Sequence, residues 1–152
     1  MREDTFNRIC QFLYSGSYTL PAPVLEPLGR DASEHELWEN HANVYYCHMD
    51  IYLYARQWDM ETLCLYGRAH LQLLAKTQKP LAGRVVDLVN LIWYAYANVT
   101  KEQDKFLLEM VTKYAADSMK VHRSWRVELH DLSTRIPEFA SEFAWQLANI
   151  LP

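Results

Sequence analysis

The chain has 152 residues and a formal net charge of −4, from 15 basic and 19 acidic side chains. Half of its residues are hydrophobic and 22% are charged, which is typical of a folded globular protein and argues against disorder along most of the length. The negative balance gives no overall attraction to phosphate backbones, so we expect no nucleic-acid partner. A chain of this length can bury a single core, and we predict one helical domain over residues 1–152.

The sequence carries no signal that predicts secretion or membrane insertion. Its first ten residues, MREDTFNRIC, are charged and lack the apolar core of a signal peptide. The longest apolar stretch, residues 85–99, is interrupted by Asp87 and Asn90 and is too short to span a bilayer. The three cysteines are an odd number at wide spacings, which is typical of reduced thiols. We therefore expect an intracellular protein, in the nucleus or the cytoplasm, with no membrane partner.

Helical spacing of apolar residues recurs from end to end, while strand signals are poor, so we predict an all-α, multi-helix array of about six to seven helices. The first helix is expected to begin at Asp4, as its N-cap, and to end before Gly16. Residues 15–31 then contain three prolines and are expected to form a loop without a regular helix.

The middle of the chain predicts a pair of helices. Ser33 and Glu36 match a capping box, which would open a long helix that runs through Leu37 to Ala55. Asp59 is expected to cap the next helix, and the two helices should pack against each other.

The last part of the chain predicts further helices. Residues 85–98 form the most apolar helix, which we expect to be buried between neighbours. Thr100 and Gln103 match a second capping box, which would open the following helix. A short helix is expected around residues 125–132, and Pro137 suits the first turn of the last helix.

The titratable residues do not predict catalysis or metal binding. His41 and His48 lie about two helical turns apart, and the sequence has no HExxH motif and no paired CxxC motif. It also lacks a GxSxG elbow and a phosphate-binding glycine loop. Glu138 and Glu142 lie one turn apart near a helix start, where acids favour the helix dipole. We therefore expect no enzyme, no metal site and no cofactor.

The ten tyrosines and five tryptophans are mostly expected in the core, but those at the ends of predicted elements could contact a partner. The candidate partner-contact residues are Tyr18, Trp38, Trp58 and Trp125.

Two segments resemble parts of a BTB/POZ domain. The stretch EDTFNRICQFLYSGSYTLP is similar to the end of that domain, with Ser15 where the family usually has Thr. The stretch HANVYYCHMDIYLYARQWDMETLCLYGRAHLQLL is similar to its C-terminal helical hairpin, with Arg56 and Trp58 where the family usually has Asp and Tyr. The order of the two segments and the proline-rich spacer between them are similar to BTB proteins of filamentous fungi.

The resemblance implies that one set of residues packs the first helix and its turn against the hairpin. These residues are Phe6, Ile9, Phe12, Leu13, Tyr14, Gly16, Tyr18, Tyr52, Ala55, Trp58 and Leu63. It covers residues 1–76 and leaves residues 77–152 as a helical C-terminal extension. In the family the strands, the first helical hairpin, the dimerisation surface and the acidic cullin-contact motif all precede the helix at Phe6. We therefore expect a truncated domain, either a fragment of a longer BTB protein or a helical half that stands alone.

The sequence thus predicts a non-catalytic protein–protein interaction module whose protein partner it does not identify. One alternative is a substrate adaptor of a cullin-based ubiquitin ligase, although the usual cullin-contact motif is absent. Another alternative is a small-molecule-binding helical protein, which would require a deep apolar pocket in its tyrosine-rich core.

Overall fold

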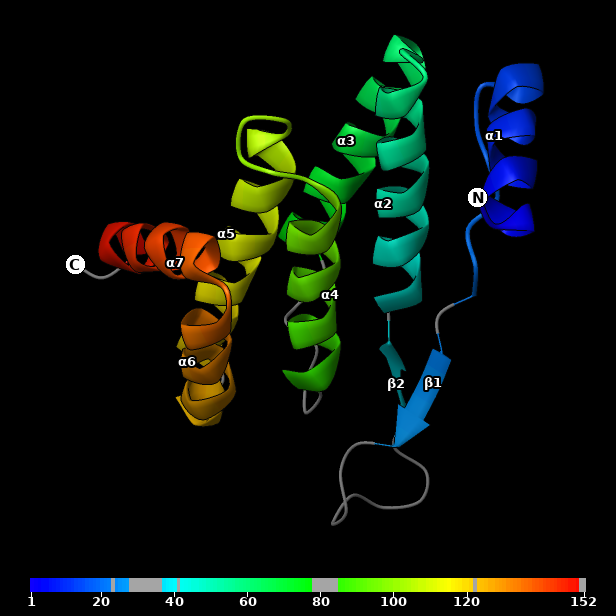
Figure 1. Ribbon diagram of the computed structural model, residues 1–152. Helices are drawn as coiled ribbons and strands as arrows, with labels where there is room; N and C mark the ends of the chain where they lie inside the picture. Colours follow the sequence, from blue (N-terminus) through cyan, green and yellow to red (C-terminus); the bar gives the residue numbers. More distant parts are fainter. Residues whose placement is uncertain (23, 28–36, 41, 78–84, 122, 151–152) are drawn as a thin grey trace. The chain divides into compact units, whose positions relative to one another are not determined.

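A computed structural model of the protein describes residues 1–22, 24–27, 37–40, 42–121 except 78–84, and 123–150. This part of the chain contains seven α-helices, two short strands and one turn of 3₁₀ helix, which confirms the predicted all-α, multi-helix fold. The elements are α1 (Glu3–Ser15), β1 (Val24–Pro27), β2 (Leu37–Asn40), α2 (Ala42–Gln57), α3 (Glu61–Thr77), α4 (Val85–Asn98), α5 (Lys105–Val121), η1 (Arg123–Trp125), α6 (Arg126–Arg135) and α7 (Pro137–Ile150) (Figure 1). They fall into two compact units, residues 1–77 and 78–152, while the prediction of one domain stays a prediction.

Helix α1 begins two residues earlier than predicted, because its N-cap is Arg2 and not Asp4, and it ends where predicted. Arg2 is its N-cap and makes no side-chain capping bond, so the expectation that Asp4 caps the helix is wrong. Glu3 and Asp4 instead lie in the first turn, where their charge favours the helix dipole. The end is set by Gly16, which has a φ of 78° and donates its N–H to the carbonyl oxygen of Phe12 at 2.8 Å.

Two strands that the sequence did not predict follow α1. β1 and β2 pair antiparallel, with Val24 opposite Asn40 and Pro27 opposite Leu37. Leu37 therefore lies in a strand, and the prediction that it belongs to a helix is wrong. The capping residues Ser33 and Glu36 lie outside the described residues. Each strand has only four residues, which is too short for an alternating apolar pattern to predict a strand or its pairing partner.

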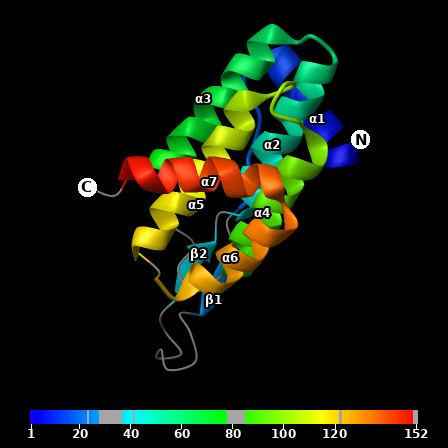
Figure 2. The ribbon, with the colours of Figure 1, turned by 60° about the vertical axis from the view of Figure 1, so that its left-hand side comes forward.

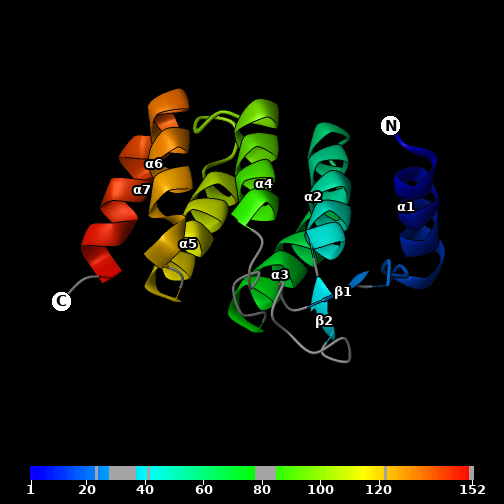
Figure 3. The ribbon, with the colours of Figure 1, turned by 90° about the horizontal axis from the view of Figure 1, so that it is seen from below.

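Helices α2 and α3 form the predicted pair, joined by a tight turn. Figures 1 and 3 show α2 between α1 and α3. Asp59 has a φ of 53° and lies in the turn before α3, so its predicted role as the cap of that helix is wrong. The chain reverses there because Met60 donates its N–H to the carbonyl oxygen of Ala55 at 2.8 Å. The helices approach closely at Gly67, where an added Cβ would lie 3.4 Å from the Cβ of Tyr52.

The core of the first unit joins α1 to this pair of helices. Its buried side chains are Ile9, Tyr18, Cys47, Ile51, Ala55 and Leu63. Phe12 of α1 also contacts Tyr66 of α3, with 5.1 Å between the ring centroids. Arg2 forms an ion pair with the buried Asp50 of α2, so α1 is attached at its start as well as along its inner face.

The second unit consists of α4 to α7. Thr100 and Gln103 form a reciprocal capping box, as predicted, with N–H···O distances of 3.0 and 3.3 Å. The box closes the turn before α5, so the prediction that it opens this helix is wrong. The helix is capped by Asp104, whose Oδ1 accepts the N–H of Leu107 at 3.1 Å. Pro137 is the first residue of α7, as predicted. Figure 2 shows α7 crossing α5, and these two helices contact each other extensively.

The buried residues of the second unit come from all four of its α-helices. Leu88 and Ile92 of α4, Leu107 and Val111 of α5, Leu129 and Leu132 of α6, and Phe139 of α7 are buried. The second unit thus has an apolar core of its own, and α5 and α7 are held together by it.

The close contact between α2 and α3 predicts a large effect of truncating Tyr52. Replacing this buried side chain by Ala removes a ring from the interior, and we expect the free energy of unfolding to fall by about 3 kcal/mol. Tyr14→Ala is the matched control, because that ring is exposed and its loss should cost less than about 0.5 kcal/mol. Denaturant unfolding of both variants measures the difference, and equal midpoints would show that Tyr52 does not support the hairpin.

Candidate functional site

The four aromatic residues expected to contact a partner differ in exposure. Trp58 is exposed at the end of the α2–α3 hairpin. Tyr18 and Trp125 are buried, so the structure does not support them as surface residues. Trp38 lies in β2 opposite Glu26, and its side chain is outside the described residues. Of the three whose side chains are described, Trp58 alone is available to a partner.

The residues that the BTB resemblance assigns to packing divide into an inner and an outer set. Ile9, Tyr18, Tyr52, Ala55 and Leu63 are buried, and Phe12 is half-buried. In contrast Phe6, Leu13 and Tyr14 keep 51%, 64% and 93% of their surface exposed, so the expectation that they pack against the hairpin is wrong. The apolar face of α1 is therefore wide: the hairpin covers the edge that carries Ile9 and Phe12 and leaves the edge that carries Phe6, Leu13 and Tyr14 exposed.

The uncovered side of α1 is continuous. Phe6, Cys10 and Leu13 follow each other at intervals of four and three residues, so they share one face of the helix, and Tyr14 lies beside them. We call these four residues, of which Cys10 is half-buried and the other three are exposed, the outer face of α1. Single exposed apolar side chains are ordinary, but a contiguous group of them is typical of an interaction surface.

Behind α1 lies a cluster of tyrosines and histidines. The hydroxyl of Tyr18 lies 2.5 Å from Nδ1 of His48, and both residues are buried. The ring of His48 stacks on that of His70, with centroids 5.1 Å apart and planes 16° apart. Tyr66 contacts both Tyr18 and His70, with centroid distances of 5.2 and 4.3 Å.

Burial sets the protonation states in this cluster. Burial lowers the pKa of His48 to about 4, and the neighbouring His70 acts in the same direction. Burial also raises the pKa of Tyr18. At neutral pH His48 is therefore neutral, and the Tyr18 O–H donates to its Nδ1. The cluster acts as a structural link between the segment after α1 and helix α2.

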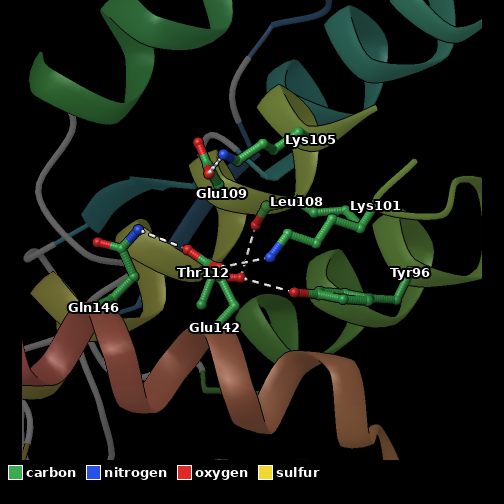
Figure 4. Close-up of polar contacts among 8 residues, drawn as sticks. All are labelled: Tyr96, Lys101, Lys105, Leu108, Glu109, Thr112, Glu142 and Gln146. Carbon is green, nitrogen blue, oxygen red and sulfur yellow. Dashed lines mark hydrogen bonds and ion pairs between the residues drawn. The ribbon is translucent and has the colours of Figure 1, made fainter. Parts of the chain in front are cut away.

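The second unit has a groove of about 480 Å³ on its surface. It is lined by Tyr96 of α4, by Lys101 from the turn before α5, by Lys105, Leu108 and Glu109 of α5, and by Glu138, Ser141, Glu142 and Trp145 of α7. Figure 4 shows that Tyr96, Lys101 and Glu142 extend from three different elements toward the same space. We call it the α5–α7 groove.

Two carboxylates of the groove, those of Glu142 and Glu109, each face a lysine, but at different distances. Glu142 accepts a hydrogen bond on Oε1 from Nε2 of the buried Gln146 at 3.1 Å, while its Oε2 lies 3.9 Å from Nζ of Lys101. Lys105 and Glu109 form an ion pair at 3.4 Å. Glu142 thus has one oxygen in a hydrogen bond and the other beyond hydrogen-bond distance from its nearest lysine.

Tyr96 is held at the edge of the groove by a short chain of hydrogen bonds. Thr112 donates its hydroxyl proton to the carbonyl oxygen of Leu108 at 2.7 Å, so the Tyr96 O–H must be the donor to Thr112 Oγ1, at 3.0 Å. Burial raises the pKa of Tyr96, and the carboxylates of Glu142 and Glu138 also favour the protonated phenol. Tyr96 therefore stays protonated, and its ring forms one wall of the groove.

The sequence does contain one signal for this groove, in acids of α7 whose position the helix dipole alone would explain. Glu138, Glu142 and Trp145 follow at intervals of four and three residues and so share one face of α7. Their spacing places them together, but the opposing residues of α5 and the turn before it come from packing, which spacing along one helix does not predict.

Within the described part of the chain, no three His, Cys, Asp or Glu side chains are arranged to hold a metal ion. Nor does any described helix have the length and apolar character needed to cross a membrane. No family model, curated protein or solved structure matches the chain, so its function has to be argued from its own residues.

The buried His48 predicts a loss of stability in mild acid. Its pKa is about 4 in the folded chain against an ordinary value of 6.5, so the unfolded chain binds more protons between these two values. The stabilisation is complete above pH 6.5 and is lost as the pH falls toward 4, by about 3 kcal/mol at most.

His48→Gln should remove this pH-dependent part of the free energy of unfolding, whereas His130→Gln, on the exposed side of α6, should leave it intact. Denaturant unfolding at pH 7, 5.5 and 4.5 measures it. If His48→Gln and the parent chain lose the same free energy over this range, His48 is not the group responsible.

Proposed function

We propose that the chain is a non-catalytic protein–protein interaction module, and that the outer face of α1 is its contact surface. The observation that carries this proposal is the exposure of Phe6, Leu13 and Tyr14 on a helix whose other side is firmly attached. Large apolar and aromatic side chains in a contiguous patch are what a protein interface buries at its centre. Because α1 is fixed by its inner face, these side chains are held ready for a partner.

The charges of α1 favour a different polypeptide over a second copy of the chain. Glu3 and Asp4 are exposed in its first turn, and the last turn contains no basic residue. An antiparallel pair of α1 helices would place these acids beside the carbonyl ends of the partner helix, and a parallel pair would place acids against acids. Neither pairing is favourable. We therefore infer a partner with an apolar segment next to a basic residue that faces Glu3 and Asp4.

The resemblance to BTB/POZ proteins enters this proposal for residues 1–76. It is supported by the order of the elements, a short helix ending at Gly16 and then a helical pair, in the positions that the two similar segments occupy. The three cysteines are free thiols, which supports a setting inside the cell, in the nucleus or the cytoplasm. A protein partner, and not a cofactor, is then what the module would bind.

The proposal is tested by a photo-crosslinking amino acid placed at position 13, used in an extract of cells that express the gene. We expect a discrete cross-link to a different polypeptide, within an apolar segment next to a lysine or arginine. Phe6→Ser should abolish the cross-link, because it removes the exposed ring at the N-terminal end of the outer face while changing the free energy of unfolding by less than about 0.5 kcal/mol.

Leu65→Ser is the matched control, since Leu65 is equally exposed but lies on α3. It should leave the cross-link unchanged. A cross-link formed with a second copy of the chain, a cross-link that survives Phe6→Ser, or the absence of any cross-link would each overturn the proposal.

A further inference from the structure

We propose that the α5–α7 groove binds the guanidinium group of an arginine side chain from a partner polypeptide. This inference rests on the proposed role of the chain in protein contacts and gives the second unit a contact surface of its own. It depends on three features of the groove: an incompletely paired carboxylate, an exposed indole and a lysine that already lies where a cation would bind.

The carboxylate is that of Glu142. Its side chain is 14% exposed, so it has lost most of its contact with water. One oxygen accepts a hydrogen bond from Gln146, but among the described residues the other faces Lys101 Nζ at 3.9 Å, which is longer than a hydrogen bond. This oxygen is reached from the groove, and a charged donor bound there would form a stronger hydrogen bond with it than a neutral donor does.

The walls of the groove suit the rest of an arginine side chain. Trp145 is exposed and lies three residues after Glu142, so its indole is on the same face of α7. A guanidinium stacks well on an indole, and its aliphatic stem can lie along apolar side chains such as Leu108. The groove volume of about 480 Å³ lies within the range of about 300–1,000 Å³ that is typical of ligand pockets.

The charge of the groove also favours a cation. Its lining contains two lysines and three glutamates, so its formal charge is −1. Lys105 is already paired with Glu109 at 3.4 Å, and Glu138 adds a further carboxylate one turn before Glu142. The field in the groove therefore attracts a positive group.

The ammonium group of Lys101 already lies near Glu142, so this part of the groove accommodates a cation. This ammonium is a point charge 3.9 Å from Glu142, on a side chain that is otherwise exposed. A guanidinium is planar and can donate two parallel hydrogen bonds to one carboxylate, so it should displace the lysine. Lys101 then limits the affinity of the groove, because it competes for the same oxygen.

The test is an NMR titration of the whole ¹⁵N-labelled chain with a blocked leucyl-arginine amide. The signal observed is the indole N–H of Trp145, assigned by its loss in Trp145→Phe. We expect a saturable shift with the arginine peptide and none with the citrulline peptide, which has the same shape without the charge. Agmatine, a free guanidinium compound, should bind more weakly than the peptide.

Substitutions in the groove distinguish residues that bind the arginine side chain from residues that only support the fold. Glu142→Gln should raise Kd about tenfold, because a charge-assisted hydrogen bond becomes a neutral one, while Glu128→Gln on α6 should leave Kd unchanged. Lys101→Gln should lower Kd about threefold, because it removes the internal competitor. A merely structural role of these residues would not produce this opposite pair of effects, and Lys101→Gln keeps the test decisive if Glu142→Gln fails to fold.

Several results would overturn the proposal: equal shifts with arginine and citrulline, tighter binding of agmatine than of the peptide, a Lys101→Gln variant that binds no better, or no saturable shift. The titration does not use α1, so Phe6→Ser should leave it unchanged. Failure at the groove with an intact cross-link at Leu13 would therefore refute this inference alone, and the converse would refute the proposed role of α1.

Discussion

Two polar contacts determine how the first helix is attached to the first unit. Arg2 pairs with the buried Asp50 just before α1 begins, and Tyr18 donates to the buried His48 just after it ends. Because both partners lie in α2, the helix between these contacts is held along the hairpin at both ends. The edge of the apolar face that carries Ile9 and Phe12 then faces inward, and the neighbouring edge that carries Phe6 and Leu13 stays exposed. The exposed apolar surface of α1 follows from these contacts.

His48 and Glu142 differ in how their burial is compensated. In the first unit His48 has a hydrogen-bond partner and a stacking partner, so its burial is compensated within the core. In the second unit Glu142 is largely buried, but its nearest cation lies beyond hydrogen-bond distance. A buried polar group whose hydrogen bonds are made within the protein stabilises the fold. A carboxylate beside an open groove, with its nearest cation beyond hydrogen-bond distance, can instead form a hydrogen bond with a ligand.

Local signals in the sequence predicted the features that depend on a few neighbouring residues. Gly16 ends α1, the Thr100–Gln103 box closes the turn before α5, and Pro137 starts α7, since each depends on backbone groups within one turn. The pairing of β1 with β2 joins segments separated by nine residues and could not be predicted from spacing.

The sides of α1 were ambiguous for a different reason. Ile9 and Phe6 are three residues apart and share one apolar face, so spacing alone does not show which edge of that face is covered. The covered edge depends on Asp50 and His48, which lie more than thirty residues along the chain from Ile9. The α5–α7 groove was hidden in the same way, because Glu142 and Lys101 meet only through the packing of α7 on α5.

The separation of Tyr18 from His48 along the chain also has a consequence for local unfolding. Their bond closes a loop of thirty residues, whereas α2 and α3 are joined by a tight turn at Asp59 and pack along their lengths. Helix α1 can therefore detach while the hairpin keeps its own contacts, so its amide hydrogens should exchange with solvent through an opening that costs less than global unfolding. Each such opening uncovers Cys47 and Ile51, so a partner that covers α1 also protects the thiol behind it.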